Sequence, residues 1–142
     1  MANDNGSDFA RSMSIATSGL RAQAGRMRLI SENIANADST ALTAGGDPYR
    51  RKVPSFTSAL DRSLDAKTIT MGRVRNDQSA FRVKNEPGSP AADAAGNVKY
   101  PNVNPLVEMT DMREAQRSYE ANLNIISATR RMIQRTLDIL KA

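Results

Sequence analysis

The chain has 142 residues and a net charge of +5, which suits a single domain and excludes an arrangement of several large lobes. Leu, Ile, Val and Phe make up 26 of the 142 residues, about 18% and just below the roughly 20% at which a chain struggles to fold alone, so we expect a weak monomer that gains order from partners. Because the chain has no Cys and no His, structural zinc, haem held through these side chains, disulfides, Cys nucleophiles and Ser-His-Asp triads are excluded.

The first eight residues contain neither a basic region nor an apolar core, so we expect no cleavable Sec-type signal peptide. No apolar run approaches the roughly 18 residues of a membrane span. The sequence therefore predicts a protein without membrane insertion, which is soluble or leaves the cytoplasm by another route.

Residues 1–38 are expected to form the N-terminal helix of a helical core domain. Steps of four and three residues connect a mostly apolar set of positions, which is the spacing of a heptad seam. Gly19 and Gly25 weaken this helix by about 1 kcal/mol each relative to Ala; close approach of another backbone and simple tolerance both remain open as explanations. The predicted seam consists of Phe9, Met13, Ala16, Leu20, Gln23, Met27, Ile30, Ile34 and Ala37.

Residues 39–100 hold four of the prolines and most of the turn residues, which predicts an irregular, β-containing middle segment. Short strands are expected at 68–71, 73–75, 81–84 and 98–100, and an exposed loop at 85–97, which has no large apolar residue. The stretch from Gly45 to Pro48 lacks the Gly-Lys-Ser/Thr ending of a phosphate-binding loop, so we interpret it as a turn.

Residues 101–142 are expected to complete the core domain with a second helix, from Pro105 to about Lys141 and roughly 55 Å long. Asn104 can cap its first amides, and proline suits the first helical position. Acidic residues lie early and basic residues late, as the helix dipole favours. Its predicted seam consists of Met109, Met112, Gln116, Tyr119, Leu123, Ile126, Arg130, Ile133, Leu137 and Leu140.

The matching seams predict a mainly α fold in which the two terminal helices pack as an antiparallel coiled-coil-like pair. In the register that matches every step, Gln23 lies opposite Gln116 and Leu20 opposite Tyr119. Two amides at one layer could hydrogen-bond and align the helices.

A second apolar stripe lies roughly 100° or more around each helix from its seam. One hairpin cannot bury both stripes. They are either scattered surface residues, which are common, or contacts to neighbours in a packed assembly of subunits that need not close. The second stripes comprise Ile15, Ala22 and Leu29 on the first helix and Ile125, Met132 and Ile139 on the second.

The basic clusters at Arg50-Arg51-Lys52 and at Arg21, Arg26 and Arg28 could bind phosphates, but no aromatic residue interleaves with them as a stacking platform. We therefore favour solvated or subunit-facing charge. A small nucleic-acid-binding protein and an enzyme using carboxylates or Tyr119 remain as alternatives, although neither explains paired seams at both termini. We expect no catalytic activity, metal, cofactor, nucleic acid or small-molecule substrate.

The two ends of the chain resemble the axial proteins of the bacterial flagellum, and the whole chain is similar to the FlgC-type proximal-rod proteins of the basal body. Ser89 and Asn97 depart from the His and the aromatic residue usual at these places. The resemblance is carried by residues 18–23 (SGLRAQ), 30–39 (ISENIANADS), 48–52 (PYRRK), 86–90 (EPGSP), 100–104 (YPNVN), 108–109 (EM), Met112 and 115–122 (AQRSYEAN).

The resemblance implies a structural subunit that is exported through the flagellar type III apparatus and assembles with itself and with other rod proteins. It would then form part of the torque-transmitting rod that crosses the periplasm. A weak monomer without a cleavable signal fits that route, because ordering on assembly would keep subunits apart until export.

Overall fold

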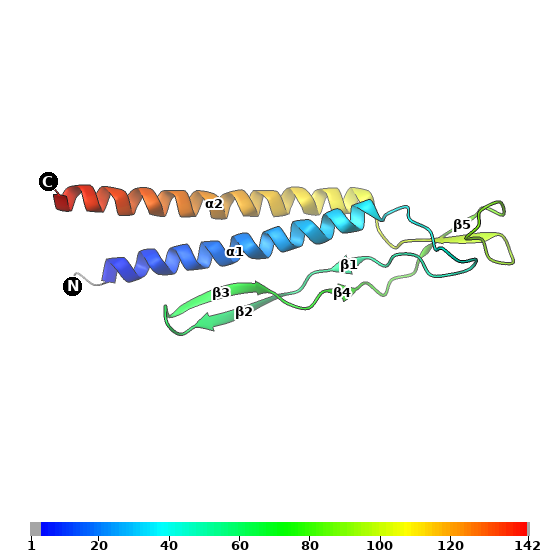
Figure 1. Cartoon of the computed structure of the whole chain (residues 1–142), viewed down its shortest axis with the longest axis horizontal. Coiled ribbons are helices and arrows are strands. Elements are labelled where there is room, and N and C mark those ends of the chain that lie inside the picture. The colour runs from blue at the N-terminus through cyan, green and yellow to red at the C-terminus, as the bar shows by residue number, and fades with distance from the viewer. Residues whose placement is uncertain (1–3, 142) are drawn as a thin grey trace. The chain divides into compact units, whose positions relative to one another are not determined.

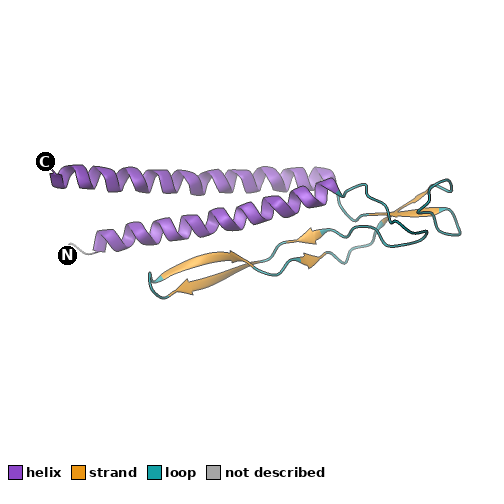
Figure 2. Ribbon diagram, viewed as in Figure 1, coloured by secondary structure: helices purple, strands orange, loops and turns teal. Residues whose placement is uncertain are grey.

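The computed structural model describes residues 4–141, which form two long helices and three two-stranded antiparallel sheets (Figures 1 and 2). This confirms the expected mainly α fold with a small β-containing middle segment. Residues 1–3 and 142, which fall in the expected segments 1–38 and 101–142, lie outside the described residues. In chain order the elements are α1 (Asp4–Ala35), β1 (Lys52–Val53), β2 (Phe56–Asp61), β3 (Ala66–Met71), β4 (Arg75–Asn76), β5 (Arg82–Asn85), β6 (Asn97–Tyr100) and α2 (Pro105–Lys141).

The contacts divide the chain into two compact units, and each long helix contributes to both. Unit 1 contains the residues up to Arg26, Ser55–Arg73 and the residues from Glu114 onward. Unit 2 contains Met27–Pro54 and Val74–Arg113. The units therefore cut across the segments 1–38, 39–100 and 101–142 that were expected from the sequence.

Helix α2 has the bounds that its local signals predict. The Asn104 side-chain oxygen accepts a hydrogen bond from the Leu106 amide at 3.1 Å, and the Asn104 carbonyl accepts one from the Glu108 amide. Pro105 occupies the first helical position, where a missing N–H has no cost. The capping prediction and the extent of the helix are therefore confirmed.

Helix α1 begins earlier and ends slightly earlier than its seam suggested. Asn36 follows the last helical residue, and its side-chain amide donates to the Glu32 carbonyl at 2.8 Å. The Ser39 hydroxyl donates to the Asn36 carbonyl at 2.9 Å. These bonds satisfy carbonyls that a helix end leaves without partners, so Ala37 lies beyond the helix although it is buried.

The longest hairpin pairs β2 with β3, from Phe56 opposite Met71 to Asp61 opposite Ala66. Its turn includes Asp65 at a φ of 46°, a conformation that Asp tolerates better than most residues. The strand expected at 68–71 is confirmed as part of β3. Strand β2 was not expected, because the sequence FTSALD lacks a clear apolar alternation.

The remaining strand expectations are partly confirmed. The segments 81–84 and 98–100 overlap β5 and β6, whereas only Arg75 of 73–75 lies in a strand. The turn at Gly45 is confirmed by its φ of 67°. The exposed loop expected at 85–97 is confirmed only in part, because Asn85 and Asn97 belong to β5 and β6 and Ala91 and Gly96 are buried. The Ala91 carbonyl accepts a hydrogen bond from the Gly45 amide, and a Cβ at Gly96 would lie 3.0 Å from Pro87.

In unit 1 the two helices approach each other at small residues. A Cβ at Gly19 would lie 2.9 Å from side-chain atoms of Asn122, and Arg26 forms an ion pair with Glu114 at 3.3 Å. These contacts are offset by one to two residues from the expected register, and Gln116 is exposed. The proposed Gln23–Gln116 layer is therefore wrong. The buried residues of unit 1 are small instead. They are Ala16, Gly19, Ala22, Ala66, Ala115 and Thr129.

The close approach at Gly19 predicts a coupled effect of two substitutions. Gly19→Ala should gain less than the usual ~1 kcal/mol of helix propensity in the natural chain, because the new methyl group meets Asn122; in an Asn122→Ala background the gain should reach about 1 kcal/mol. Urea unfolding followed by circular dichroism measures both. Gly6→Ala, with no neighbour within 4 Å, should be indifferent to Asn122→Ala. Additivity at Gly19 would contradict the contact.

Candidate functional site

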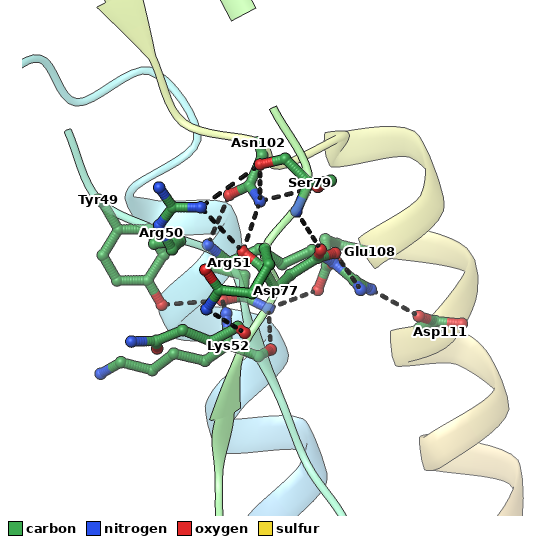
Figure 3. A network of polar contacts seen from close by, with 12 residues as sticks. Tyr49, Arg50, Arg51, Lys52, Asp77, Ser79, Asn102, Glu108 and Asp111 are labelled. Carbon is green, nitrogen blue, oxygen red and sulfur yellow. Dashed lines mark hydrogen bonds and ion pairs between the residues drawn. The ribbon is translucent and has the colours of Figure 1, made fainter. Parts of the chain in front are cut away.

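A network of polar side chains lies in unit 2, where the end of α1, the segment 49–52 and the start of α2 meet (Figure 3). We call it the polar junction. Its members come from segments far apart in the sequence, so it forms only in the folded chain. The polar junction comprises Asn33, Tyr49, Arg51, Lys52, Asp77, Asn102, Glu108 and Asp111.

Glu108 is the buried centre of the polar junction, with only 1% of its surface exposed. One carboxylate oxygen accepts from the Arg51 Nε at 2.6 Å, and the other accepts from the Asn33 side-chain amide at 3.0 Å. Glu108 also lies in the first turn of α2, where the helix dipole favours negative charge. These partners offset the cost of removing a carboxylate from water.

Asn33 is equally buried and uses all its hydrogen-bonding capacity. Its oxygen accepts from the Tyr49 hydroxyl at 2.8 Å and from the Lys52 backbone amide at 2.9 Å. Its nitrogen donates to the Lys52 carbonyl at 2.9 Å and to Glu108. An amide offers two donors and two acceptor positions, so Asn33 ties the last turns of α1 to the segment leading into β1.

Arg51 links three carboxylates. Besides Glu108, its guanidinium lies 3.6 Å from Asp77 and 3.6 Å from Asp111. Burial alone would lower the pKa of Arg51, but the hydrogen bond and charge of Glu108, with the two aspartates, raise it above its ordinary value. The pKa of Asp77 is lowered by hydrogen bonds from the Ser79 amide and hydroxyl and by Arg51. Both partners therefore stay charged at neutral pH.

The cluster Arg50-Arg51-Lys52 thus differs from the expected solvated or subunit-facing charge. Lys52 forms an ion pair with Glu32, and the Arg50 guanidinium lies 4.2 Å from the centre of the Phe81 ring. The charges serve contacts within the chain. The sequence places Glu108 in the first turn of α2, where the helix dipole favours a negative charge. No neighbouring residues in the sequence indicated that Glu108 would be buried or would bind Asn33.

The residues proposed for the assembly seam lie at different depths in the single chain. Along α2, burial falls one position earlier than the seam at Glu108, Ala115 and Thr129. Of the proposed seam residues, Ile30 is buried; Phe9, Met13, Leu20, Gln23, Met27, Ile34, Met112, Tyr119, Ile126 and Ile133 are half-buried; Met109, Gln116, Leu123, Leu137 and Leu140 are exposed.

The proposed second-face residues are mostly exposed. Leu29 is buried within the chain, whereas Ile125, Met132 and Ile139 are 47%, 55% and 76% exposed. With the exposed Leu123, Leu137 and Leu140 they leave much of the second half of α2 uncovered and apolar. Extensive exposed apolar surface is typical of a protein–protein contact. These side chains form two stripes on different sides of the helix. We use the name α2 apolar face for the two stripes together, Leu123, Leu137 and Leu140 on the seam side and Ile125, Met132 and Ile139 on the other.

Residues 4–141 contain no helix long and apolar enough to cross a membrane. The same described part of the chain has no cluster of three or more acidic side chains placed to hold a metal ion.

The burial of Glu108 predicts a large loss of stability when its carboxylate is removed. Glu108→Ala should lower the free energy of unfolding by about 3 to 5 kcal/mol, because Arg51 and Asn33 lose a buried partner. Glu114→Ala removes a carboxylate from an ion pair whose Glu114 side chain is 67% exposed, and should cost about 0 to 1 kcal/mol. Chemical unfolding of both variants makes the comparison; equal losses would contradict the central role of Glu108.

The environment of Tyr49 predicts that its hydroxyl ionises at an unusually high pH. Burial, followed by the charges of Glu32 and Glu108, raises the pKa of Tyr49 to about 12. Since the folded value lies above the ordinary value of about 10, the stabilisation is complete below pH 10 and is lost as pH rises from about 10 to 12. The pKa of Tyr100 is also raised, chiefly by its hydrogen bond to Glu86, so the titration is made in a Tyr100→Phe background. There the phenolate absorbance should show one late step that adding Tyr49→Phe removes. An unchanged titration in that variant would contradict this assignment.

Comparison with known proteins gives one consistent family. Residues 13–41 match the family described as flagella basal body rod protein, and residues 94–139 match the C-terminal family of flagellar basal body rod FlgEFG proteins. Flagellar basal-body rod protein FlgC of Agrobacterium fabrum is 52% identical over 90% of this chain and 92% of its own length. The FlgC proteins of Bacillus subtilis and Aquifex aeolicus are 37% and 34% identical, over 92% and 94% of this chain and 97% and 98% of their own. The chain therefore belongs to the FlgC family of flagellar basal-body rod proteins.

Proposed function

We propose that this chain is a structural, non-catalytic subunit of the proximal rod, which polymerises with itself and with other rod proteins into the drive shaft of the flagellum. The observation that carries the proposal beyond family membership is the α2 apolar face. Ile139 and Leu140 are 76% and 78% exposed, and covering such side chains contributes roughly 25 cal/mol per Å² of apolar surface. Assembly is the event that would cover them.

Small residues between the helices and exposed large apolar residues on α2 together support a second proposal. The helices α1 and α2 pack as an antiparallel coiled-coil-like pair, and neighbouring subunits complete it. Within unit 1 the helices meet at Gly19, where Asn122 fills the space a side chain would take. Small residues allow close approach but bury little apolar area. The remaining heptad positions, including Leu123 and Leu137, then serve contacts between subunits.

Export through the flagellar type III apparatus fits a chain with a small core. Few large apolar side chains are buried in the described residues, so unfolding before export costs little and the helices gain most of their stability after assembly. The polar junction then has a mechanical role, because it fastens the segment 49–52 and the start of α2 to the end of α1. A rigid fastening of this kind suits the transmission of torque.

The proposed location is tested by mass spectrometry of detergent-washed hook and basal bodies from the source bacterium, with the soluble fraction as control. The chain should be retained with the rod. Its absence from intact basal bodies, together with abundant soluble protein, would favour a free binding protein; steep loss of DNA binding with rising salt would then identify a nucleic-acid-binding one.

A charge in the α2 apolar face should prevent assembly without preventing folding. Leu123 is 47% exposed, so Leu123→Asp should leave expression and helicity close to normal while abolishing flagellation, since assembly would bury an unpaired carboxylate. Asn124→Asp adds the same charge at the neighbouring exposed position without removing an apolar side chain, and should be much less damaging. Swimming assays and counts of flagella measure both. Normal motility of Leu123→Asp would contradict the role of this face.

A further inference from the structure

Leu42 is the most exposed large apolar residue among residues 6–141, with a relative exposure of 101%. Packing within its own chain therefore buries none of this side chain. Covering a fully exposed leucine removes apolar surface from water, which is favourable. It lies in the connection between α1 and β1, in unit 2.

The loop that carries Leu42 is held at both ends. We call residues 39–46 the Leu42 loop. The Ser39 amide donates to the Asn36 carbonyl at 3.2 Å, the Gly45 amide to the Ala91 carbonyl at 3.1 Å, and the Gly46 amide to the Thr43 carbonyl at 3.1 Å. Gly45 takes a φ of 67°, which glycine adopts without strain. The leucine is therefore presented by a fastened turn.

Unit 2 also contains an apolar depression that could receive such a side chain. It lies on the first two turns of α2, has a volume of about 290 Å³ and is lined by Asn104, Leu106, Val107, Thr110 and Asp111. We call it the Leu106 pocket. Its volume is about ten times the ~30 Å³ occupied by one water, which is enough for the four side-chain carbons of leucine. Leu106 and Val107 are 75% and 48% exposed.

The charges of the two surfaces are compatible with burial. The Leu42 loop contains no charged residue. The Leu106 pocket has one charged lining residue, Asp111, which already lies 3.6 Å from the Arg51 guanidinium. Contact between them leaves no carboxylate or ammonium buried without a partner. The larger cavity of unit 1, about 580 Å³, includes the charged residues Arg21 and Asp61 and several Ser and Thr residues in its lining, and suits leucine less well.

We propose that Leu42 of one subunit inserts into the Leu106 pocket of a second copy of this chain. The proposal rests on the proposed function and specifies one of its subunit contacts. In the proposed arrangement the contact is heterologous: each copy offers one leucine and one pocket, and successive copies join head to tail. A heterologous contact whose rotation does not close extends a helical assembly, as the proposed function requires.

The absence of cysteine from the natural chain allows a direct test by disulfide formation. One chain carries Leu42→Cys, another carries Thr110→Cys, and both are expressed in the same motile cells. Basal bodies are isolated and oxidised, and a product of twice the chain mass is sought by non-reducing electrophoresis and mapped by mass spectrometry. Gly88→Cys, at an exposed glycine with no neighbour within 4 Å, replaces Leu42→Cys in the control. A cross-link between positions 42 and 110, absent from the control, is expected.

A second measurement compares incorporation of Leu42→Ser and Leu42→Met into the rod in competition with the natural chain. Serine should reduce incorporation about tenfold, because an apolar side chain can no longer be buried, whereas methionine should restore most of it. The folded spectrum of each purified variant should be unchanged, since Leu42 contacts nothing in its own chain.

The outcomes separate this inference from the function on which it rests. Incorporation of the chain into basal bodies without a 42–110 cross-link, or with normal incorporation of Leu42→Ser, would overturn the Leu42 contact and leave the rod function standing. A loss of incorporation in Leu42→Ser without any 42–110 cross-link would show that another rod protein receives Leu42, and would overturn the second copy as occupant. Absence of the natural chain from basal bodies would overturn both.

Discussion

The buried carboxylate of Glu108 is the interaction on which the architecture of unit 2 depends. A carboxylate with 1% exposure is stable only while Arg51, Asn33 and the first turn of α2 all remain in place. Each of these partners binds something further: Asn33 holds Tyr49 and both backbone groups of Lys52, and Arg51 holds Asp77 and Asp111. The end of α1, the segment 49–52 and the start of α2 are thus ordered together, through polar contacts where a larger protein would use an apolar core.

In the described residues, unit 1 is packed through small side chains and not through a buried polar network of the kind found in unit 2. Its buried residues are mainly alanine, glycine and threonine, while leucine, isoleucine and methionine side chains of α2 lie exposed. Packing small residues lets two helices approach but removes little apolar area from water. This supports the proposal that neighbours in the rod cover the same apolar side chains. Family membership and surface chemistry therefore lead to the same function.

The basic residues illustrate how composition and structure relate to function here. A net charge of +5 left nucleic acid as an alternative partner, yet the densest basic cluster, Arg50-Arg51-Lys52, is engaged with Glu108, Glu32 and the Phe81 ring. Its charges order the chain and are not presented as a phosphate-binding surface. The exposed apolar side chains of the described residues include the α2 apolar face in unit 1 and Leu42 in unit 2, and these are the surfaces proposed here for contacts between subunits.

Local signals in the sequence determined the two helices, the bounds of α2, the turn at Gly45 and the family. Caps, proline positions, charge order and apolar periodicity act over a few residues, and the family motifs are read directly. The depth of each seam residue was decided by the tertiary structure, because the offset between two helices depends on which side chains meet across them. Here Asn122 lies opposite Gly19, and Ala115 and Thr129 are the buried residues of α2 in unit 1. Strand β2 needed its partner β3, and the polar junction needed Asn33, Arg51 and Glu108 to be brought together from across the chain. No local pattern could indicate that Glu108 would be buried or that Leu42 would be left fully exposed, since both follow from contacts that only the folded chain makes or leaves unmade.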